Sequence, residues 1–149
     1  MLDFMDIRYE MAHDVKALVD EIVKAMNFHH IVRERVLCIR SRGSRAKRTV
    51  ARIHGLPRIW QTSLKTQPYY AIEVISERYD SLSGEEKEKT IIHELLHVPK
   101  SFRGGFRHHR GWINRRKIEG LHKILVEKRK LGEGFQENRQ NNVSTRTLS

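Results

Sequence analysis

The sequence predicts a small α+β domain in which a sheet packs against helices. Apolar residues recur at helical spacing over 10–27, and β-branched and aromatic residues fill 69–75. Helical patterns return over 83–98 and over 111–131. The order of helix, two or three strands and two helices is typical of a small sheet covered by helices. At 149 residues the chain can form one domain core but not two, so we predict a single domain over residues 1–131.

Each element has its own local signal. The first helix has an apolar stripe at Met11, Val15, Leu18, Val19, Ile22, Val23 and Met26. A strand is predicted over 35–42, and 50–60 reads as extended structure interrupted by Gly55-Leu56-Pro57. Ser83 is a predicted N-cap with Glu86 three residues later, and Pro99 prevents continuation of that helix. From residue 132 to residue 149 the chain is polar and aperiodic, which predicts a disordered tail.

Charge and composition narrow the partners. The formal net charge is +11, and the basic residues gather in 33–58 and 100–130. Such clusters favour DNA or RNA as a partner, although a basic solubility surface is the simpler alternative. The single cysteine, Cys38, excludes an internal disulfide and a cysteine-based zinc site within one chain. No apolar run approaches the ~20 residues of a membrane span, so we expect no membrane partner and a cytoplasmic location.

The most informative motif is His93-Glu94-Leu95-Leu96-His97, an H-E-x-x-H string in a predicted helix. Positions i and i+4 lie one turn apart on the same helix face, so His93 and His97 can direct two imidazole nitrogens at one ion. Glu94 lies beside them and can reach a water bound to that ion. Zinc peptidases use this arrangement together with a third ligand and an open position for water.

The third ligand is expected downstream of the helix. His108 and His109 lie eleven and twelve residues past His97, after a glycine-bearing segment that can turn back. An acidic ligand from the following helix is the alternative, with Glu119 and Glu127 as candidates. A basic surface loop is the simplest non-functional interpretation of the histidine pair. Candidates for stabilising the oxyanion of the reaction are Tyr69, Tyr70, Arg107 and His108.

The segment from Ala51 to Leu125 resembles the predicted metallopeptidases of archaea and their viruses, a group related to the SprT-like zincins. The resemblance is carried by 52–61, by the strand-like 70–77, by the motif and its continuation through Lys100, and by 104–106 leading into 109–112. It implies a zincin-like fold with a zinc ion held by His93, His97 and His109, and Glu94 as general base. In SprT-like proteins a glycine commonly follows the third histidine, whereas Arg110 stands there in this chain. His108 therefore stays an alternative third ligand.

These observations predict a zinc-dependent metallopeptidase that hydrolyses proteins or peptides. Because SprT-like proteases include enzymes that act on DNA-attached proteins, the basic segments suggest substrates associated with nucleic acid. One alternative is a non-catalytic nucleic-acid-binding domain in which zinc only stabilises the fold. A second alternative is a metal-dependent hydrolase or nuclease that acts on a bond other than the peptide bond.

Overall fold

The computed structural model describes residues 6–106 and 111–146, with side chains described through residue 132. In chain order the elements are β1 (Arg8–Met11), α1 (His13–Ala25), the 3₁₀ helix η2 (Arg33–Arg35), β2 (Val36–Arg42), β3 (Ala51–Gly55), α2 (Arg58–Leu64), β4 (Tyr70–Ile75), α3 (Ser76–Tyr79), α4 (Gly84–Leu96) and α5 (Arg115–Arg146). The predicted α+β class is confirmed. The zincin-like assignment stays a prediction.

The sheet is small and mixed, which is one of the two arrangements, mixed or antiparallel, that we expected. Its strand order is β1-β2-β4-β3, with β2 and β4 parallel and the two outer strands antiparallel to their neighbours. Ile72 in β4 is opposite Cys38 on one side and Ile53 on the other. Among the described residues β3 is therefore an edge strand, and it lies beside α4.

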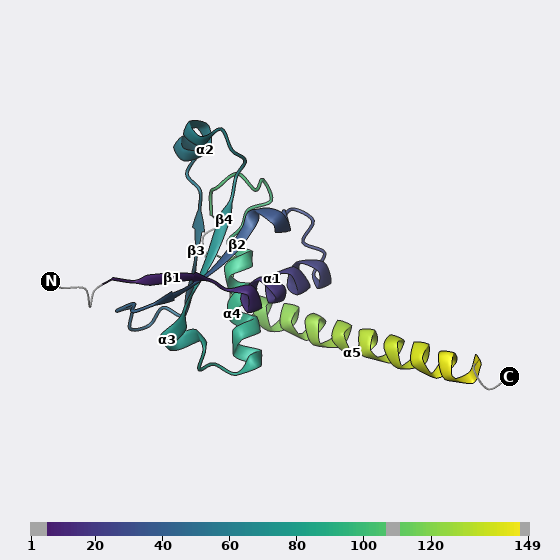
Figure 1. Cartoon of the computed structure of the whole chain (residues 1–149). Helices are drawn as coiled ribbons and strands as arrows, with labels where there is room; N and C mark the ends of the chain where they lie inside the picture. The colour runs from purple at the N-terminus through teal and green to yellow at the C-terminus, as the bar shows by residue number, and fades with distance from the viewer. Residues whose placement is uncertain (1–5, 107–110, 147–149) are drawn as a thin grey trace.

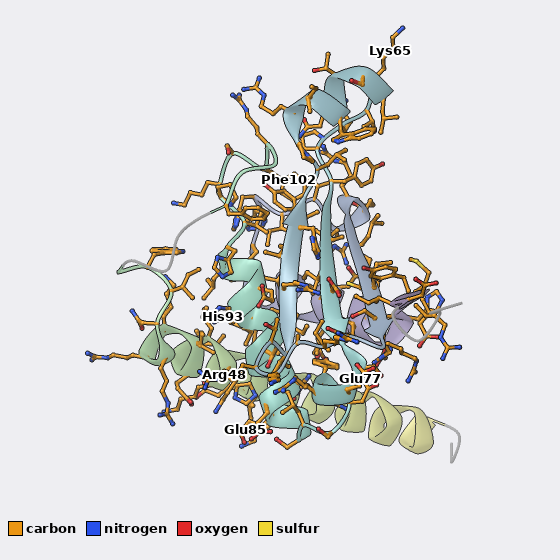
Figure 2. The ribbon with its side chains drawn as sticks, turned by 90° about the vertical axis from the view of Figure 1, so that its left-hand side faces the viewer. Arg48, Lys65, Glu77, Glu85, His93 and Phe102 are labelled. Carbon is orange, nitrogen blue, oxygen red and sulfur yellow. The ribbon has the colours of Figure 1, made fainter. Side chains whose placement is uncertain are left out.

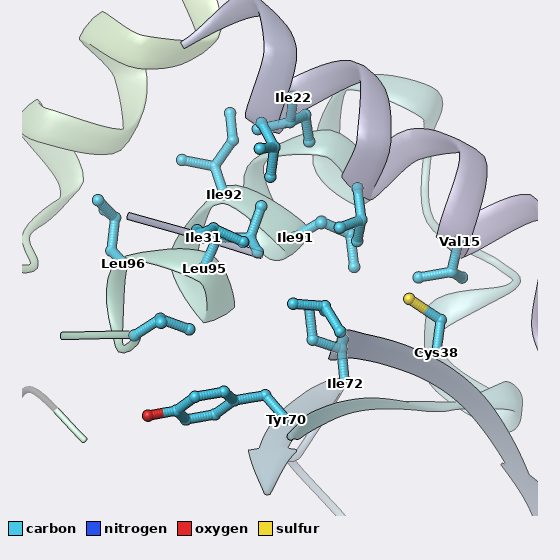
Figure 3. Close-up of a cluster of buried hydrophobic side chains, with 14 of the residues drawn as sticks. Val15, Ile22, Ile31, Cys38, Tyr70, Ile72, Ile91, Ile92, Leu95 and Leu96 are labelled. Atoms are coloured by element: carbon cyan, nitrogen blue, oxygen red, sulfur yellow. The ribbon is translucent and has the colours of Figure 1, made fainter. Parts of the chain in front are cut away.

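Helices α1, α4 and α5 lie on one side of the sheet (Figure 1). The core forms where these helices meet the strands (Figure 3). Its fully buried side chains include Val15, Val19, Ile22, Ile72, Ile91, Ile92, Leu95 and Leu125. Cys38 is also buried, and burial raises the pKa of its thiol to about 12. The expected apolar stripe of the first helix is confirmed from Val15 to Val23, but Met11 was wrongly included, because it is 55% exposed and lies in β1. Helix α4 is fixed between the sheet and α5.

Helix α5 extends well away from the rest of the domain (Figure 1). Its first half is attached to the domain by Glu88 of α4, which accepts hydrogen bonds from Arg129 at 2.8 Å and lies 3.3 Å from His122. The helix continues past residue 131, and the expected boundary between domain and tail stays a prediction. No helix in the described ranges combines the length and the apolar character needed to cross a membrane.

The sequence-based expectation was wrong at Ile59-Trp60, which lies in α2 rather than in extended structure. Pro57 immediately precedes the helix with its φ at −58°, a value compatible with helix entry. Ile59, Trp60 and Leu64 are 73%, 56% and 59% exposed, so their apolar character carried no information about a buried face. Strand β1 and helix α3, each four residues long, were not predicted.

Candidate metal centre

Helix α4 begins and ends where the sequence indicates. The Ser83 hydroxyl accepts a hydrogen bond from the Glu86 amide at 3.2 Å, and the Glu86 carboxylate accepts one from the Ser83 amide at 3.3 Å. This capping box satisfies two of the free amides at the helix N-terminus. His97 is the C-cap, and Pro99 follows two residues later. The motif therefore occupies the last turn of a helix whose apolar face is buried in the core.

The two motif histidines face each other. The Nε2 atoms of His93 and His97 lie 3.3 Å apart, and their ring centroids are 5.1 Å apart. Two nitrogens that each lie about 2.05 Å from one tetrahedral ion are about 3.3 Å apart. Both rings are half-buried, and Figure 2 shows His93 on the side of α4 near the sheet edge. The pair therefore fits the spacing that a shared zinc ion requires.

Glu94 has the most unusual environment of the three motif residues. Its side chain is only 7% exposed, and burial raises the pKa of its carboxyl group to about 7. The residue nevertheless lines the same cleft as His93. A carboxyl group in this position is screened from bulk water and still reachable by a molecule in the cleft.

The cleft has a volume of about 660 Å³ and lies between α4, the segment entering β3 and the start of α5. Besides His93 and Glu94 it is lined by Arg48, Thr49, Val50, Ala51, Lys89, Thr90, Ile113, Asn114, Arg115, Ile118 and Glu119. Glu119 had been considered as an acidic ligand. Most of the other residues lie far from the motif in the sequence and carry no recognisable local pattern, so sequence reasoning missed them.

Cationic groups surround the mouth of this cleft. Lys89 binds Glu85 at 2.7 Å and Glu119 at 3.0 Å, so its charge is compensated. Arg115 is 94% exposed, and its ion pair with Glu119 is long, at 3.9 Å. Arg48 has no carboxylate partner among the described residues. A ligand entering the cleft meets mainly the positive charges of Arg48 and Arg115.

The candidates for a third ligand have different outcomes. His108 and His109 lie outside the described residues, so their role stays a prediction. Glu119 reaches the cleft but binds Lys89, and Glu127 is exposed. Within the described ranges, no cluster of three or more histidine, cysteine or carboxylate side chains could hold a metal.

Tyr70 is not suited to the oxyanion role considered for it. The residue is 1% exposed, and its hydroxyl accepts a hydrogen bond from the Gly104 amide and donates one to the Gly105 carbonyl. The only hydroxyl proton is already used. Arg107 and His108 lie outside the described residues, and Tyr69 is half-buried.

An H-E-x-x-H helix at a cleft, within a small α+β domain, is the arrangement of a metal-dependent peptidase. The chain belongs to the family described as "Putative phage metallopeptidase", whose family model matches residues 7–131. No curated protein and no solved structure matched the chain. Membership implies a metal cofactor and protein or peptide substrates. The archaeal and SprT-like relation stays a prediction.

Proposed function

We propose that the protein is a zinc-dependent metallopeptidase with its active site in the cleft beside α4. The observation that carries this proposal is the 3.3 Å separation of the His93 and His97 Nε2 atoms next to the buried carboxyl group of Glu94. His93 and His97 would hold the ion together with His109, with His108 as the alternative third ligand. The family match supports the peptidase class and a metal.

In this mechanism bound zinc supplies Lewis acidity, which polarises the scissile carbonyl and makes water a better nucleophile. Glu94 takes the proton of the attacking water and passes it to the leaving amine. Its position suits both steps because its carboxyl group is shielded by the core and open to the cleft.

The neighbouring strand favours a peptide as the substrate. Val50 and Ala51, at the start of β3, line the cleft together with His93 and Glu94. Because β3 is an edge strand in the described sheet, one side of its backbone can pair with an extended chain. Such pairing would place a peptide beside the catalytic groups, and it distinguishes a peptide from substrates without a regular amide backbone.

The proposal is tested by measuring zinc content and casein cleavage on the same purified samples. We expect one zinc per chain in the wild type and its loss in His93→Ala, His97→Ala and His109→Ala. Glu94→Gln should keep zinc and lose activity by about 10²–10⁴-fold, the usual contribution of a general base. Glutamine is close in shape and neutral, so it suits a site whose burial disfavours the charged carboxylate.

Glu34→Gln is the matched control because Glu34 is exposed on η2 and lies outside the cleft. Retained cleavage in Glu94→Gln would refute the assignment of the base. Zinc that is needed for folding, without any cleavage, would favour the structural-zinc alternative. Cleavage of DNA or RNA instead of casein would favour the nuclease alternative.

We also propose nucleic acid as a partner through the basic segments 33–58 and 100–130. The support is the exposed cations of these segments, such as Arg48 at the cleft, which has no carboxylate partner among the described residues. Binding through phosphates would weaken steeply as salt rises. Weak binding that salt does not change would refute this part of the proposal without affecting the peptidase.

A further inference from the structure

Helix α2 presents an apolar face to solvent. Ile59, Trp60 and Leu64 are each more than half exposed. At about 100° per residue they lie within an arc of about 140° around the helix, so they share one face. Single exposed apolar residues are common on protein surfaces, but large ones gathered on one face form a patch of the kind that marks a docking site.

Contacts on the other side of α2 keep this face turned outward. Gln61 lies outside the apolar arc, and its side-chain amide donates to the Leu56 carbonyl at 2.8 Å and to the Arg103 carbonyl at 3.0 Å. Gly55, shortly before α2, lies so close to the loop after α4 that a Cβ there would be 2.4 Å from the Gly104 carbonyl oxygen. The exposure of the apolar face therefore follows from how α2 is held, and not from loose attachment.

The one polar side chain within the apolar arc already has its hydrogen bond. By the same helical geometry Ser63 lies between Ile59 and Trp60 around the helix, and its hydroxyl donates to the Ile59 carbonyl at 2.7 Å. A hydroxyl with a hydrogen bond inside the protein costs less to remove from water than one without. This face of α2 can therefore enter an apolar environment.

The surroundings of the apolar face are basic. Neither residues 35–72, which include α2, nor residues 95–118, which include the supporting loop, contain an aspartate or a glutamate. Arg58, Lys65 and Arg103 are exposed, and none of them has a carboxylate partner among the described residues. Lys65 lies at the outer tip of α2 (Figure 2). A partner with complementary chemistry offers negative charge around an apolar interior.

We propose that α2 is a peripheral docking site for a membrane surface that contains anionic lipids. Such a surface has negatively charged headgroups above apolar acyl chains, and it therefore matches both the cations and the apolar face. Nucleic acid matches less well, because the aliphatic side chains of Ile59 and Leu64 neither bind phosphates nor stack on bases as aromatic rings do. Peripheral binding needs no membrane-spanning segment, whereas the expectation of no membrane partner rested on the lack of one.

The docking site and the proposed active site lie at different places in the domain. Ala51, at the start of β3, lines the cleft, whereas α2 follows the end of that strand. Helix α2 projects from one end of the sheet, opposite α3 (Figure 1). Since no residue of α2 lines the cleft, this inference does not rest on the proposed function.

The test is sedimentation of the full chain with vesicles of phosphatidylcholine alone and of phosphatidylcholine with about 30% phosphatidylserine. We expect binding to the anionic vesicles to be at least tenfold tighter, because each cation near an anionic surface contributes about fivefold. Equal binding to the two kinds of vesicle, or binding to neither, would overturn the inference.

A double variant tests the apolar face. Ile59→Ser with Leu64→Ser should weaken binding to the anionic vesicles at least tenfold, because the binding strength scales with the apolar area that is buried. Ile124→Ser with Leu131→Ser is the matched control, since it makes the same two substitutions at exposed positions of α5. This control should bind like the wild type. Equal losses in the two double variants would overturn the inference.

A second pair of variants tests the cations. Arg58→Gln with Lys65→Gln should weaken binding to the anionic vesicles by about 25-fold, at fivefold for each charge. Arg116→Gln with Lys123→Gln removes the same charge from exposed positions of α5 and should leave binding unchanged. The same loss in both pairs would show that only net charge matters, which would overturn a docking site at α2.

Tryptophan fluorescence reports on α2 without altering it. The chain has two tryptophans, so Trp112→Phe leaves Trp60 as the only one. Its emission should shift to shorter wavelengths with anionic vesicles and stay unchanged with neutral ones, because the ring enters an apolar environment. An unchanged emission with both would overturn the inference.

Binding to an oligonucleotide is the competing outcome. If Ile59→Ser with Leu64→Ser weakened oligonucleotide binding while the wild type bound no vesicles, the inference would be overturned in favour of nucleic acid. Casein cleavage by the same samples reports on the proposed function separately, so the two failures are distinguishable.

Discussion

Reversing the charge of Arg48 should change which peptides the protein cleaves. Arg48 lines the cleft together with His93 and Glu94, and no acidic partner for it occurs in the described ranges. Across the cleft, Arg115 is 94% exposed. A substrate with an acidic side chain near the scissile bond would therefore be attracted, and one with a lysine there would be repelled. We expect Arg48→Glu to reverse or abolish this preference.

The magnitude follows from the exposure of the group. A solvent-exposed ion pair contributes about 0.2–1 kcal/mol, and reversing one charge replaces attraction by repulsion of similar size. Each of the two peptides therefore changes by about 0.4–2 kcal/mol, in opposite directions, so the preference for a glutamate peptide over a lysine peptide should shift by about 0.8–4 kcal/mol. This corresponds to a change of about four- to 900-fold in the ratio of the two kcat/KM values.

The assay compares two fluorogenic peptides that differ only by glutamate or lysine at one position. The ratio of their kcat/KM values is measured for the wild type, for Arg48→Glu and for the control Arg58→Glu. Arg58 is exposed at the start of α2 and lies outside the cleft. Because both variants replace an arginine by a glutamate, they have the same net charge. High salt should bring all ratios together, because it screens exposed charges. The same ratio in both variants at low salt would refute the reasoning.

Two further predictions concern stability. Burial alone would raise the pKa of Glu73, but hydrogen bonds from Arg52 and His54 outweigh it and lower the pKa to about 2. Because the pKa of Glu73 is lower in the folded state than the unfolded value of 4.5, the ionised carboxylate stabilises the fold by at most about 3 kcal/mol above pH 4.5. This stabilisation is lost as the pH falls towards 2. Thermal unfolding from pH 6 to pH 2.5 should show a shallower loss for Glu73→Gln than for wild type, and parallel curves would contradict this. Ser83→Ala should lower the free energy of unfolding by about 1 kcal/mol in urea titrations, because it removes the cap that the Glu86 amide uses, whereas Ser83→Gly should cost less.

The elements that the sequence predicted correctly are those whose signals are local. Helix α4 has a capping pair three residues apart and a proline after its end, and both act within the helix itself. His93 and His97 also lie side by side because residues four apart in the sequence are about one helical turn apart on the same face. Strand β4 is β-branched and aromatic and lies at the centre of the sheet. In these cases local chemistry and tertiary packing favour the same structure.

The parts that could not be predicted depend on contacts between distant segments. The cleft needs Arg48 and Val50 from the segment entering β3 and Ile113 from the segment before α5, and only the sheet and the helix packing bring them to His93. Helix α2 is exposed, so periodicity had no buried face to report. The Tyr70 hydroxyl resembles any other tyrosine in a strand until its two loop partners are known. The sequence alone identifies the helix that carries the H-E-x-x-H motif but not the elements that surround it.

The distribution of charge shows the same limit. The basic residues gather in two segments of the sequence, but several of their side chains serve the fold. Arg40 binds Asp14 and Asp80 on the helical side of the sheet, and Arg52 binds Glu73 in the central strand. Arg129 connects α5 to Glu21 of α1 and to Glu88 of α4. Because successive strand residues point to opposite faces, basic residues that are close in sequence need not share a surface. The case for a polyanionic partner therefore rests on exposed cations such as Arg48 and Arg115 rather than on the net charge, and these same two groups line the cleft of the proposed active site.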